Sequence, residues 1–155
     1  MIIYIDLEEQ YRKIYRYCYF KLQHQQLAED ITQETFLKFY ESNQYVEAGK
    51  KVRYLYKIAH NLCVDLYRKE KIDTKPLTDE LFVEDTEEEI LTSIAVTRAL
   101  MQLEQVEQEI LLLRYVNEVP VSDICNILHI SRFALYRKTK KAVEHFKNIL
   151  GEGFI

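Results

Sequence analysis

Glycine and proline are scarce in this chain, which has 3 glycines and 2 prolines among 155 residues. Because these residue types are the strongest breakers of regular structure, there are few points at which a helix would be interrupted. No stretch alternates apolar and polar residues for long enough to predict a sheet. The sequence therefore predicts an all-α protein.

Cysteines are also few, and their arrangement does not fit the usual cysteine sites. Cys18, Cys63 and Cys125 are widely spaced and odd in number, with no CxxC pair and no Cys/His cluster. This spacing argues against a zinc site and against a disulfide framework. Each cysteine lies in an apolar helical pattern, so we expect buried free thiols in a reducing cytoplasm, and no metal or other cofactor.

Long apolar runs are absent as well. No run approaches the roughly 18 to 20 residues that a membrane span needs. The first ten residues, MIIYIDLEEQ, are too short and too acidic for a signal peptide. We expect a soluble, cytoplasmic protein that does not insert into a membrane.

Catalytic groupings are missing too, which makes an enzyme the least favoured class. The four histidines, at positions 24, 60, 129 and 145, are scattered along the chain. No nucleophile–base arrangement, glycine-rich phosphate loop or metal-ligand spacing accompanies them. We expect no catalytic residue, and we interpret the histidines as surface or turn residues, apart from His60, which could contact DNA.

Charge is distributed unevenly, although the formal net charge is only −4. Residues 50–71 carry seven Lys or Arg against two acids, whereas residues 73–89 carry eight acids against Lys75. A second basic segment, 126–147, has six Lys or Arg against the single acid Glu144. Two basic modules therefore flank an acidic connector.

The acidic segment is the best candidate for a linker, because it offers little apolar surface to bury. It divides the chain into an N-terminal domain at 1–70, a linker at 71–87 and a C-terminal domain at 88–155. We expect two small helical bundles, each around its own hydrophobic centre and with its basic face outward. Apolar periodicity predicts helices near 6–23, 27–42, 50–70, 87–104, 105–117, 121–129 and 131–149.

Residues 120–148 have the pattern of a helix-turn-helix with a basic second helix. Apolar spacing gives the first helix one buried face, made by Val121, Ile124, Cys125 and Leu128. Ser131 suits the N-cap of the second helix, whose inward stripe is Leu135, Thr139, Ala142, Val143 and Phe146. Cations and aromatics lie on or near its other face: Arg132, Phe133, Tyr136, Arg137, Lys140 and Lys141, with Lys138 close by. Such a helix can enter a DNA groove; the alternative is a solvated basic helix in an ordinary bundle.

Two helices of the first module also present polar faces. In 27–42 the side opposite the apolar stripe carries Asp30, Gln33, Glu34 and Leu37, and simple solvation could explain it. In 50–70 the corresponding side mixes cations, aromatics and amides: Arg53, Tyr54, Lys57, His60, Asn61, Val64 and Arg68. Cations can follow phosphates, rings can stack on bases and amides can reach base edges, so this face suits unpaired DNA.

These segments together resemble the extracytoplasmic-function (ECF) group of bacterial sigma factors, the smallest members of the sigma-70 family. Residues 28–40, AEDITQETFLKFY, are similar to the polymerase-binding helix of that family. Residues 54–69, YLYKIAHNLCVDLYRK, are similar to its promoter-melting and −10-reading helix. The C-terminal stretches LEQVEQEILLLRYV and VSDICNILHIS resemble its helix-turn-helix region. The match spans most of the chain, in the family's order and spacing.

The resemblance implies an alternative sigma factor that binds RNA polymerase core and promoter DNA and promotes transcription initiation. Polymerase binding would fall to Asp30, Gln33, Glu34 and Leu37. The −10 element would be contacted by Asn43, Gln44, Tyr45, Tyr54, Lys57, His60, Asn61, Asp65 and Arg68. The −35 element would be contacted by Arg132, Phe133, Tyr136, Arg137, Lys138, Lys140 and Lys141. The resemblance leaves an anti-sigma factor open as a third partner.

The chain departs from the family pattern at three places. His129 stands where the turn usually has glycine, so a left-handed backbone there would cost energy. Within 133–136 (FALY), Phe, Ala and Tyr replace the commoner Gly, Thr and Lys, and VEQ at 106–108 replaces the frequent proline-containing pattern. The fold is unaffected by these changes, but the preferred −35 sequence should be unusual.

A stand-alone helix-turn-helix transcriptional regulator is the alternative function, and an interaction module such as a sigma antagonist or adaptor is a third. The regulator would not need the paired segments 28–40 and 54–69. The interaction module would not need two separate basic faces. The sequence favours the sigma factor.

Overall fold

The computed structural model of the protein describes residues 7–42, 50–70 and 87–154, and every regular element in these ranges is helical. The elements are α1 (Leu7–Leu22), α2 (Gln25–Glu41), α3 (Lys51–Glu70), α4 (Glu87–Met101), α5 (Gln105–Leu111), the π-helical η3 (Leu112–Val116), α6 (Val121–Leu128) and α7 (Arg132–Phe154). The prediction of an all-α fold is confirmed. The predicted linker, 71–87, lies outside the described residues except for its last residue.

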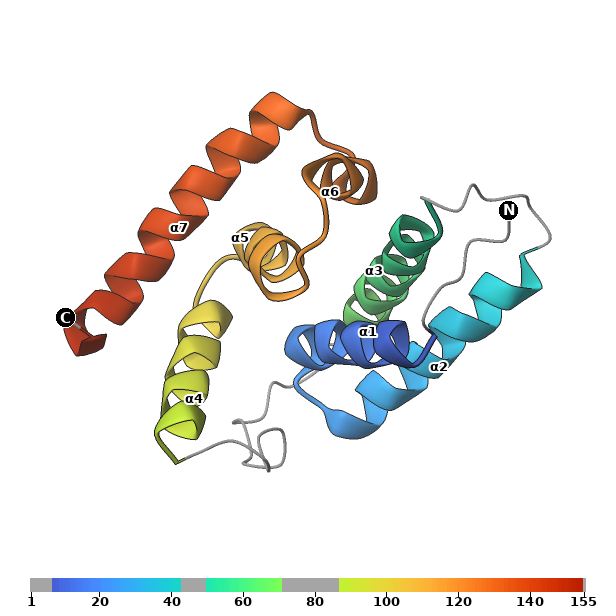
Figure 1. The fold of residues 1–155 in the computed structure, drawn as a ribbon, viewed down its shortest axis with the longest axis horizontal. Coiled ribbons are helices and arrows are strands. Elements are labelled where there is room, and N and C mark those ends of the chain that lie inside the picture. Colours follow the sequence, from blue (N-terminus) through green and yellow to red (C-terminus); the bar gives the residue numbers. More distant parts are fainter. Residues whose placement is uncertain (1–6, 43–49, 71–86, 155) are drawn as a thin grey trace.

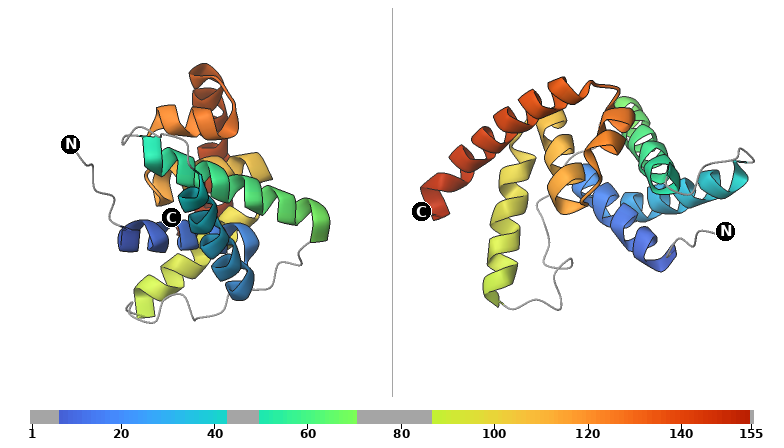
Figure 2. Two further views of the ribbon diagram at one scale, coloured as in Figure 1. Left: turned by 90° about the vertical axis from the view of Figure 1, so that its right-hand side faces the viewer. Right: turned by 45° about the horizontal axis from the view of Figure 1, so that its top comes forward.

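The helices form two groups with a short-helix layer between them (Figure 1). Helices α1, α2 and α3 pack on one another, whereas α4 and α7 lie together on the other side of the molecule. Between them, α5 packs against α7, η3 reaches α1, and α6 packs against α3. The long helix α7 extends past α5, so that the C-terminal end of the chain points away from α1 and α3 (Figure 2).

The turn of the helix-turn-helix has the local geometry that the sequence predicts. Ser131 Oγ accepts a hydrogen bond from the Ala134 N–H at 3.0 Å and so caps the first turn of α7. His129 ends α6 in the left-handed region, at φ 57° and ψ 46°. A side chain with a Cβ is strained in that region, which explains why glycine is the commoner residue at such helix ends.

The largest hydrophobic core extends across both halves of the chain. Its fully buried members include Ile14, Tyr17, Leu55 and Ala59 from α1 and α3, and Ile110, Leu113, Ile124 and Leu135 from the C-terminal half. A second cluster comprises Leu100, Leu111, Leu112 and Ala142. The expectation of a separate centre for each half therefore fails in this conformation. The cause is the buried apolar run 110–113. Ile110 and Leu113 belong to the shared core, whereas Leu111 and Leu112 belong to the second cluster.

The predicted burial on α7 and at the cysteines is confirmed in part. On α7, Leu135, Thr139 and Ala142 are buried, whereas Val143 and Phe146 are half-buried. Cys18 and Cys63 are buried and Cys125 is half-buried, all three as free thiols. In the part of the chain that the structure describes, no group of His, Cys, Asp or Glu side chains could hold a metal ion. Within the same ranges, no helix has the length and apolar character needed to cross a membrane.

Candidate nucleic-acid and polymerase interfaces

The exposed face of α7 brings together six of the seven residues predicted for the −35 element. They are Arg132, Phe133, Tyr136, Arg137, Lys140 and Lys141, all of them exposed. Phe133 is 74% exposed and Tyr136 48%, which are large values for aromatic side chains. The guanidinium carbon of Arg137 lies 5.7 Å from the centre of the Phe133 ring, so cation and ring stack on the same surface.

Arg114 and Tyr115 extend this face, although no sequence pattern pointed to them. The Arg114 guanidinium carbon lies 5.8 Å from the Tyr136 ring centre and 5.5 Å from the Tyr115 ring centre. Both belong to the π-helical η3, and they meet α7 only in the folded chain, so helical periodicity could not reveal them. Lys138, the seventh predicted residue, is instead half-buried and lines a cavity at the contact between the two halves.

The outer face of α2 carries the four residues predicted for polymerase binding. Asp30, Gln33, Glu34 and Leu37 are all exposed. On the opposite side, the buried hydroxyls of Thr32 and Thr35 donate to backbone carbonyls one turn earlier, at 2.6 and 2.7 Å. Leu37 is 60% exposed, and Tyr40, which the sequence pattern did not select, is 57% exposed. Apolar side chains surrounded by acids and amides are typical of a protein-binding surface.

The residues predicted for the −10 element lie along α3 with unequal exposure. Asn61, Asp65 and Arg68 are exposed, whereas Tyr54, Lys57 and His60 are partly buried. The other three, Asn43, Gln44 and Tyr45, fall outside the described residues. The expectation that the basic face of α3 points wholly to solvent is therefore wrong, because α6 packs beside it.

The contact between α3 and α6 encloses part of that basic face. A hollow of about 340 Å³ is lined by Lys50, Arg53, Tyr54, Lys57, Ile58, Asn61 and, from α6, Asn126. Arg53 Nε lies 3.5 Å from the Asp123 carboxylate, with both side chains largely buried. Burial raises the pKa of Asp123, although the nearby Arg53 charge acts in the opposite direction.

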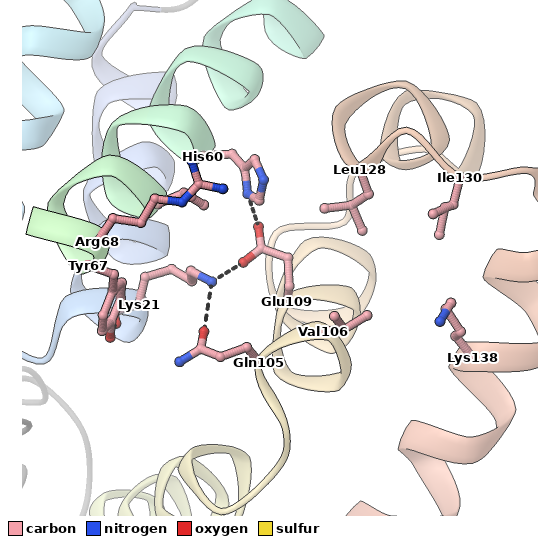
Figure 3. A pocket seen from close by; sticks show the side chains of 11 residues that line it. Lys21, His60, Tyr67, Arg68, Gln105, Val106, Glu109, Leu128, Ile130 and Lys138 are labelled. Carbon is pink, nitrogen blue, oxygen red and sulfur yellow. Dashed lines mark hydrogen bonds and ion pairs between the residues drawn. The ribbon is translucent and has the colours of Figure 1, made fainter. Parts of the chain in front are cut away.

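The most deeply buried ionic cluster is centred on Glu109 of α5, a residue that no sequence pattern singled out (Figure 3). Its carboxylate forms an ion pair with Lys21 of α1, and these side chains are only 3% and 4% exposed. It also accepts a hydrogen bond from His60 Nδ1 of α3 at 2.9 Å and another from the Tyr17 hydroxyl. Glu109 thus joins side chains from α1 and α3 to α5.

The ionisation of Glu109 follows from these contacts. Burial raises the pKa of its carboxyl, but the hydrogen bond from His60 and the charge of Lys21 outweigh that effect and lower the pKa from 4.5 to about 2. The pKa of Tyr17 is raised well above 10, first by burial and then by the neighbouring Glu109 charge. At neutral pH, Glu109 is an anion and Tyr17 remains a hydrogen-bond donor.

Comparisons with known proteins cover both halves of the chain. Residues 7–72 match the family model for Sigma-70 region 2, and residues 93–146 match the one for Sigma-70, region 4. The chain is 30% identical over 145 residues to the ECF RNA polymerase sigma factor SigW of Bacillus subtilis, a match that covers 82% of this chain and 78% of that protein. It is 26% identical over 147 residues to the ECF RNA polymerase sigma factor BldN of Streptomyces coelicolor, covering 88% of this chain and 56% of that protein.

A solved structure has the same fold. It is the sigma factor RpoE of Bartonella quintana in complex with the anti-sigma factor NepR, with a TM-score of 0.69, 12% sequence identity and 94% of each chain covered. At that identity the likeness concerns the fold alone.

The fold and the exposed face of α7 define a class, that of helical proteins with a helix-turn-helix whose second helix is basic. Within that class the matched regions are specific: the chain belongs to the ECF group of the sigma-70 family. It is an alternative sigma factor for transcription initiation, as the sequence resemblance implied. The family is one of transcription regulators rather than of catalytic enzymes.

Proposed function

We propose that this sigma factor binds RNA polymerase core through α2 and contacts a promoter through α3 and α7. The observation that carries the proposal is the exposed face of α7, where cations and aromatics lie opposite a buried apolar stripe. We assign residues 1–70 and 88–155 to separate domains and 71–87 to their linker. Since its partner is the polymerase, the protein acts in the cytoplasm, and it has no catalytic activity of its own.

On the −35 element, α7 lies in the major groove of duplex DNA. Arg132 and Arg137 are the candidates for base reading, because a guanidinium can bond two acceptors of one guanine. Lys138, Lys140 and Lys141 contact phosphates, which position the helix without reading sequence. Phe133 and Tyr136 present apolar surface that suits thymine methyl groups.

On the −10 element, α3 holds an unpaired strand. Lys57 and Arg68 follow phosphates, Tyr54 offers a stacking ring, and His60, Asn61 and Asp65 reach base edges; Asn43, Gln44 and Tyr45 contribute from the preceding segment. Extruding a base costs a few kcal/mol, whereas stacking it on one ring returns about 1–3 kcal/mol. Strand opening therefore depends on cations and on the polymerase.

At the polymerase surface, α2 contributes Asp30, Gln33, Glu34 and Leu37. Leu37 supplies exposed apolar area, and the flanking acid and amide groups supply directional contacts. An interface of this kind gains most of its affinity from a few central anchors, so Leu37 should be one of them.

The assignment of α7 is tested by transcription with purified core from a promoter mapped with the wild-type protein. Arg132→Ala with Arg137→Ala should reduce transcript yield at least about tenfold, because each good contact to a base is worth about 1–3 kcal/mol. Lys147→Ala, which removes an exposed cation from the same helix six residues beyond the last predicted contact, is the matched control. Equal yields from the double variant and the control, with both proteins folded, would remove the assignment.

A further inference from the structure

A cavity of about 540 Å³ lies where side chains of α1, α3, α5, α6 and α7 meet (Figure 3). Pockets that hold small molecules usually have volumes of about 300–1,000 Å³, mostly apolar walls and a few polar groups that fix the orientation of the ligand. The size of this cavity is therefore that of a small-molecule site, and its walls decide which chemistry it would accept.

The walls of the cavity are mainly apolar. The Tyr67 hydroxyl donates to the Lys21 carbonyl, which leaves its ring as an apolar wall. Val106 lines the cavity and is 50% exposed. Apolar walls around a cavity lack the contacts that a close-packed interior provides, and the apolar body of a ligand would supply them. The apolar side chains are Val64 and Tyr67 of α3, Val106 of α5, Leu128 of α6 and Ile130 of the following turn.

Lys138 places a positive charge beside these walls. Its side chain is half-buried and reaches the cavity from α7, on the side of Val106 and Ile130 (Figure 3). In the ranges 7–42, 50–70 and 87–154, no ion pair joins Lys138 to an acid. Because partial burial of an unpaired cation is unfavourable, a ligand carboxylate beside Lys138 would be stabilised.

The other charged side chains leave the cavity positive overall. Glu109 is the only acid among the described residues that line it, and its carboxylate is already paired with Lys21 and hydrogen-bonded by His60. Arg68 adds a second cation from the side opposite Lys138 (Figure 3). The charge of the cavity therefore favours an anion over a neutral or cationic molecule.

We infer that this cavity binds a small free acid with an apolar body, such as a medium-chain carboxylate. Its carboxylate pairs with Lys138, and its body lies against Val106, Leu128 and Ile130. Because side chains of five helices line the cavity, the site suits a single molecule in solution rather than the flat surface of a bilayer.

Ligand binding and promoter binding would use some of the same side chains. Lys138 is proposed to contact phosphate at the −35 element, whereas His60 and Arg68 are proposed for the −10 element, and all three line the cavity. The acid should therefore compete with promoter DNA and reduce transcription, a consequence that rests on the proposed function.

Isothermal titration calorimetry of the full-length protein with sodium decanoate tests the site. Lys138→Gln removes the proposed partner of the carboxylate. Lys147→Gln is the matched control, because it removes an exposed cation of the same helix that does not line the cavity. Val106→Asp replaces a half-exposed wall residue by an acid that repels the carboxylate. Decyltrimethylammonium carries a chain of the same length with the opposite charge, and acetate carries the acid without the apolar body.

Wild type and Lys147→Gln should bind one decanoate per chain with the same affinity, and neither should bind acetate or decyltrimethylammonium. Lys138→Gln should bind decanoate about tenfold more weakly, because a hydrogen bond between charged groups is lost. Val106→Asp should also bind more weakly than wild type. Circular dichroism checks that the helix content of each variant is unchanged, and if Lys138→Gln loses helix, Val106→Asp decides.

Three results of the calorimetry would overturn the inference: no saturable binding of decanoate by wild type, equal affinities for Lys138→Gln and Lys147→Gln, or equally tight binding of decyltrimethylammonium. Flotation with phosphatidylglycerol vesicles examines the other source of such a ligand. Vesicle binding by wild type without binding of decanoate would indicate a membrane lipid, and it would overturn the inference as well.

Run-off transcription with purified core distinguishes failure of the ligand site from failure of the proposed function. Decanoate should lower the transcript yield of wild type and leave that of Val106→Asp unchanged. If the proposed function is wrong, none of the proteins directs transcription, whereas calorimetry still shows decanoate binding. If only the ligand site is wrong, wild type directs transcription and calorimetry shows no saturable binding.

Discussion

At the scale of single residues, Glu109 is the side chain whose surroundings matter most. A carboxylate that is 3% exposed is stable only because Lys21 and His60 are beside it. Removing one member of such a group leaves the others buried and uncompensated, which typically costs about 3–5 kcal/mol where no rearrangement can hydrate them. Because these contacts join α5 to α1 and α3, a change at Glu109 should weaken the packing between those helices.

The lowered pKa of Glu109 predicts a particular response to acid. In the folded chain that pKa is about 2, against 4.5 for the free group. The resulting stability is fully present above pH 4.5 and is lost as the pH falls toward 2. Between pH 6 and pH 3, wild type should lose about 2 kcal/mol of unfolding free energy that Glu109→Gln does not lose.

Urea unfolding at the two pH values measures this difference. Glu104→Gln, which changes an exposed glutamate before α5, is the control and should behave as wild type. An equal loss of unfolding free energy for wild type and Glu109→Gln would mean that Glu109 is not ion-paired in solution.

At the scale of elements, α7 shows how a start signal and a periodic pattern specify both faces of a helix. Ser131 accepts the N–H of Ala134 and thereby satisfies one of the free donors of the first turn. The stripe of Leu135, Thr139 and Ala142 is buried, which turns the cations outward. The presentation of the basic face therefore depends on the burial of this stripe, and the cap stabilises the first turn of the helix.

Removal of that cap should destabilise the helix-turn-helix. We expect Ser131→Ala to cost about 1 kcal/mol and to lower the thermal midpoint by roughly 2–4 °C. Ser122→Ala, an exposed serine in α6 that does not cap a helix, is the control and should leave the midpoint unchanged. Thermal unfolding followed by circular dichroism checks both, and equal midpoints for the two variants would exclude a stabilising role for the cap.

The outer face of α2 gives a second prediction at this scale. Gln33→Ala with Glu34→Ala should abolish co-purification with polymerase core. Helix content should stay intact, because both side chains are exposed and make no contribution to the buried side of α2. Gln25→Ala with Glu41→Ala changes the same residue types at the two ends of the helix and should leave core binding unaffected. Retention of core by the first double variant would show that α2 docks elsewhere or not at all.

The sequence alone predicted the helices that are apolar on one side and polar on the other. The outward sets on α2 and α7 follow from residues three or four apart, a spacing that depends only on local geometry. The Glu109 cluster could not be predicted in this way, because His60 and Glu109 are 49 residues apart and meet only through tertiary packing. The shared core could not be predicted for a similar reason. Residues 110–113 are a continuous apolar run, and such a run does not indicate which other helices it will contact.

At the scale of the whole molecule, the balance of charge bears on how promoter binding is controlled. The net charge of −4 opposes long-range attraction to DNA. If all six cations at one site contacted phosphate, the logarithm of the binding constant would fall with the logarithm of salt concentration with a slope of at most about −5. Part of the α3 face is also covered by α6. The free protein should therefore be a poor DNA binder, and polymerase should supply the added contacts.

Run-off transcription with purified core and a library of genomic fragments tests this account most directly, because it requires polymerase binding, promoter recognition and strand opening together. The account predicts discrete transcripts that appear only when the protein is added and that share elements upstream of their start sites near −10 and −35. No transcripts beyond those of core alone, together with nanomolar, sequence-specific binding of duplex DNA by the free protein at physiological salt, would contradict it and indicate a stand-alone regulator.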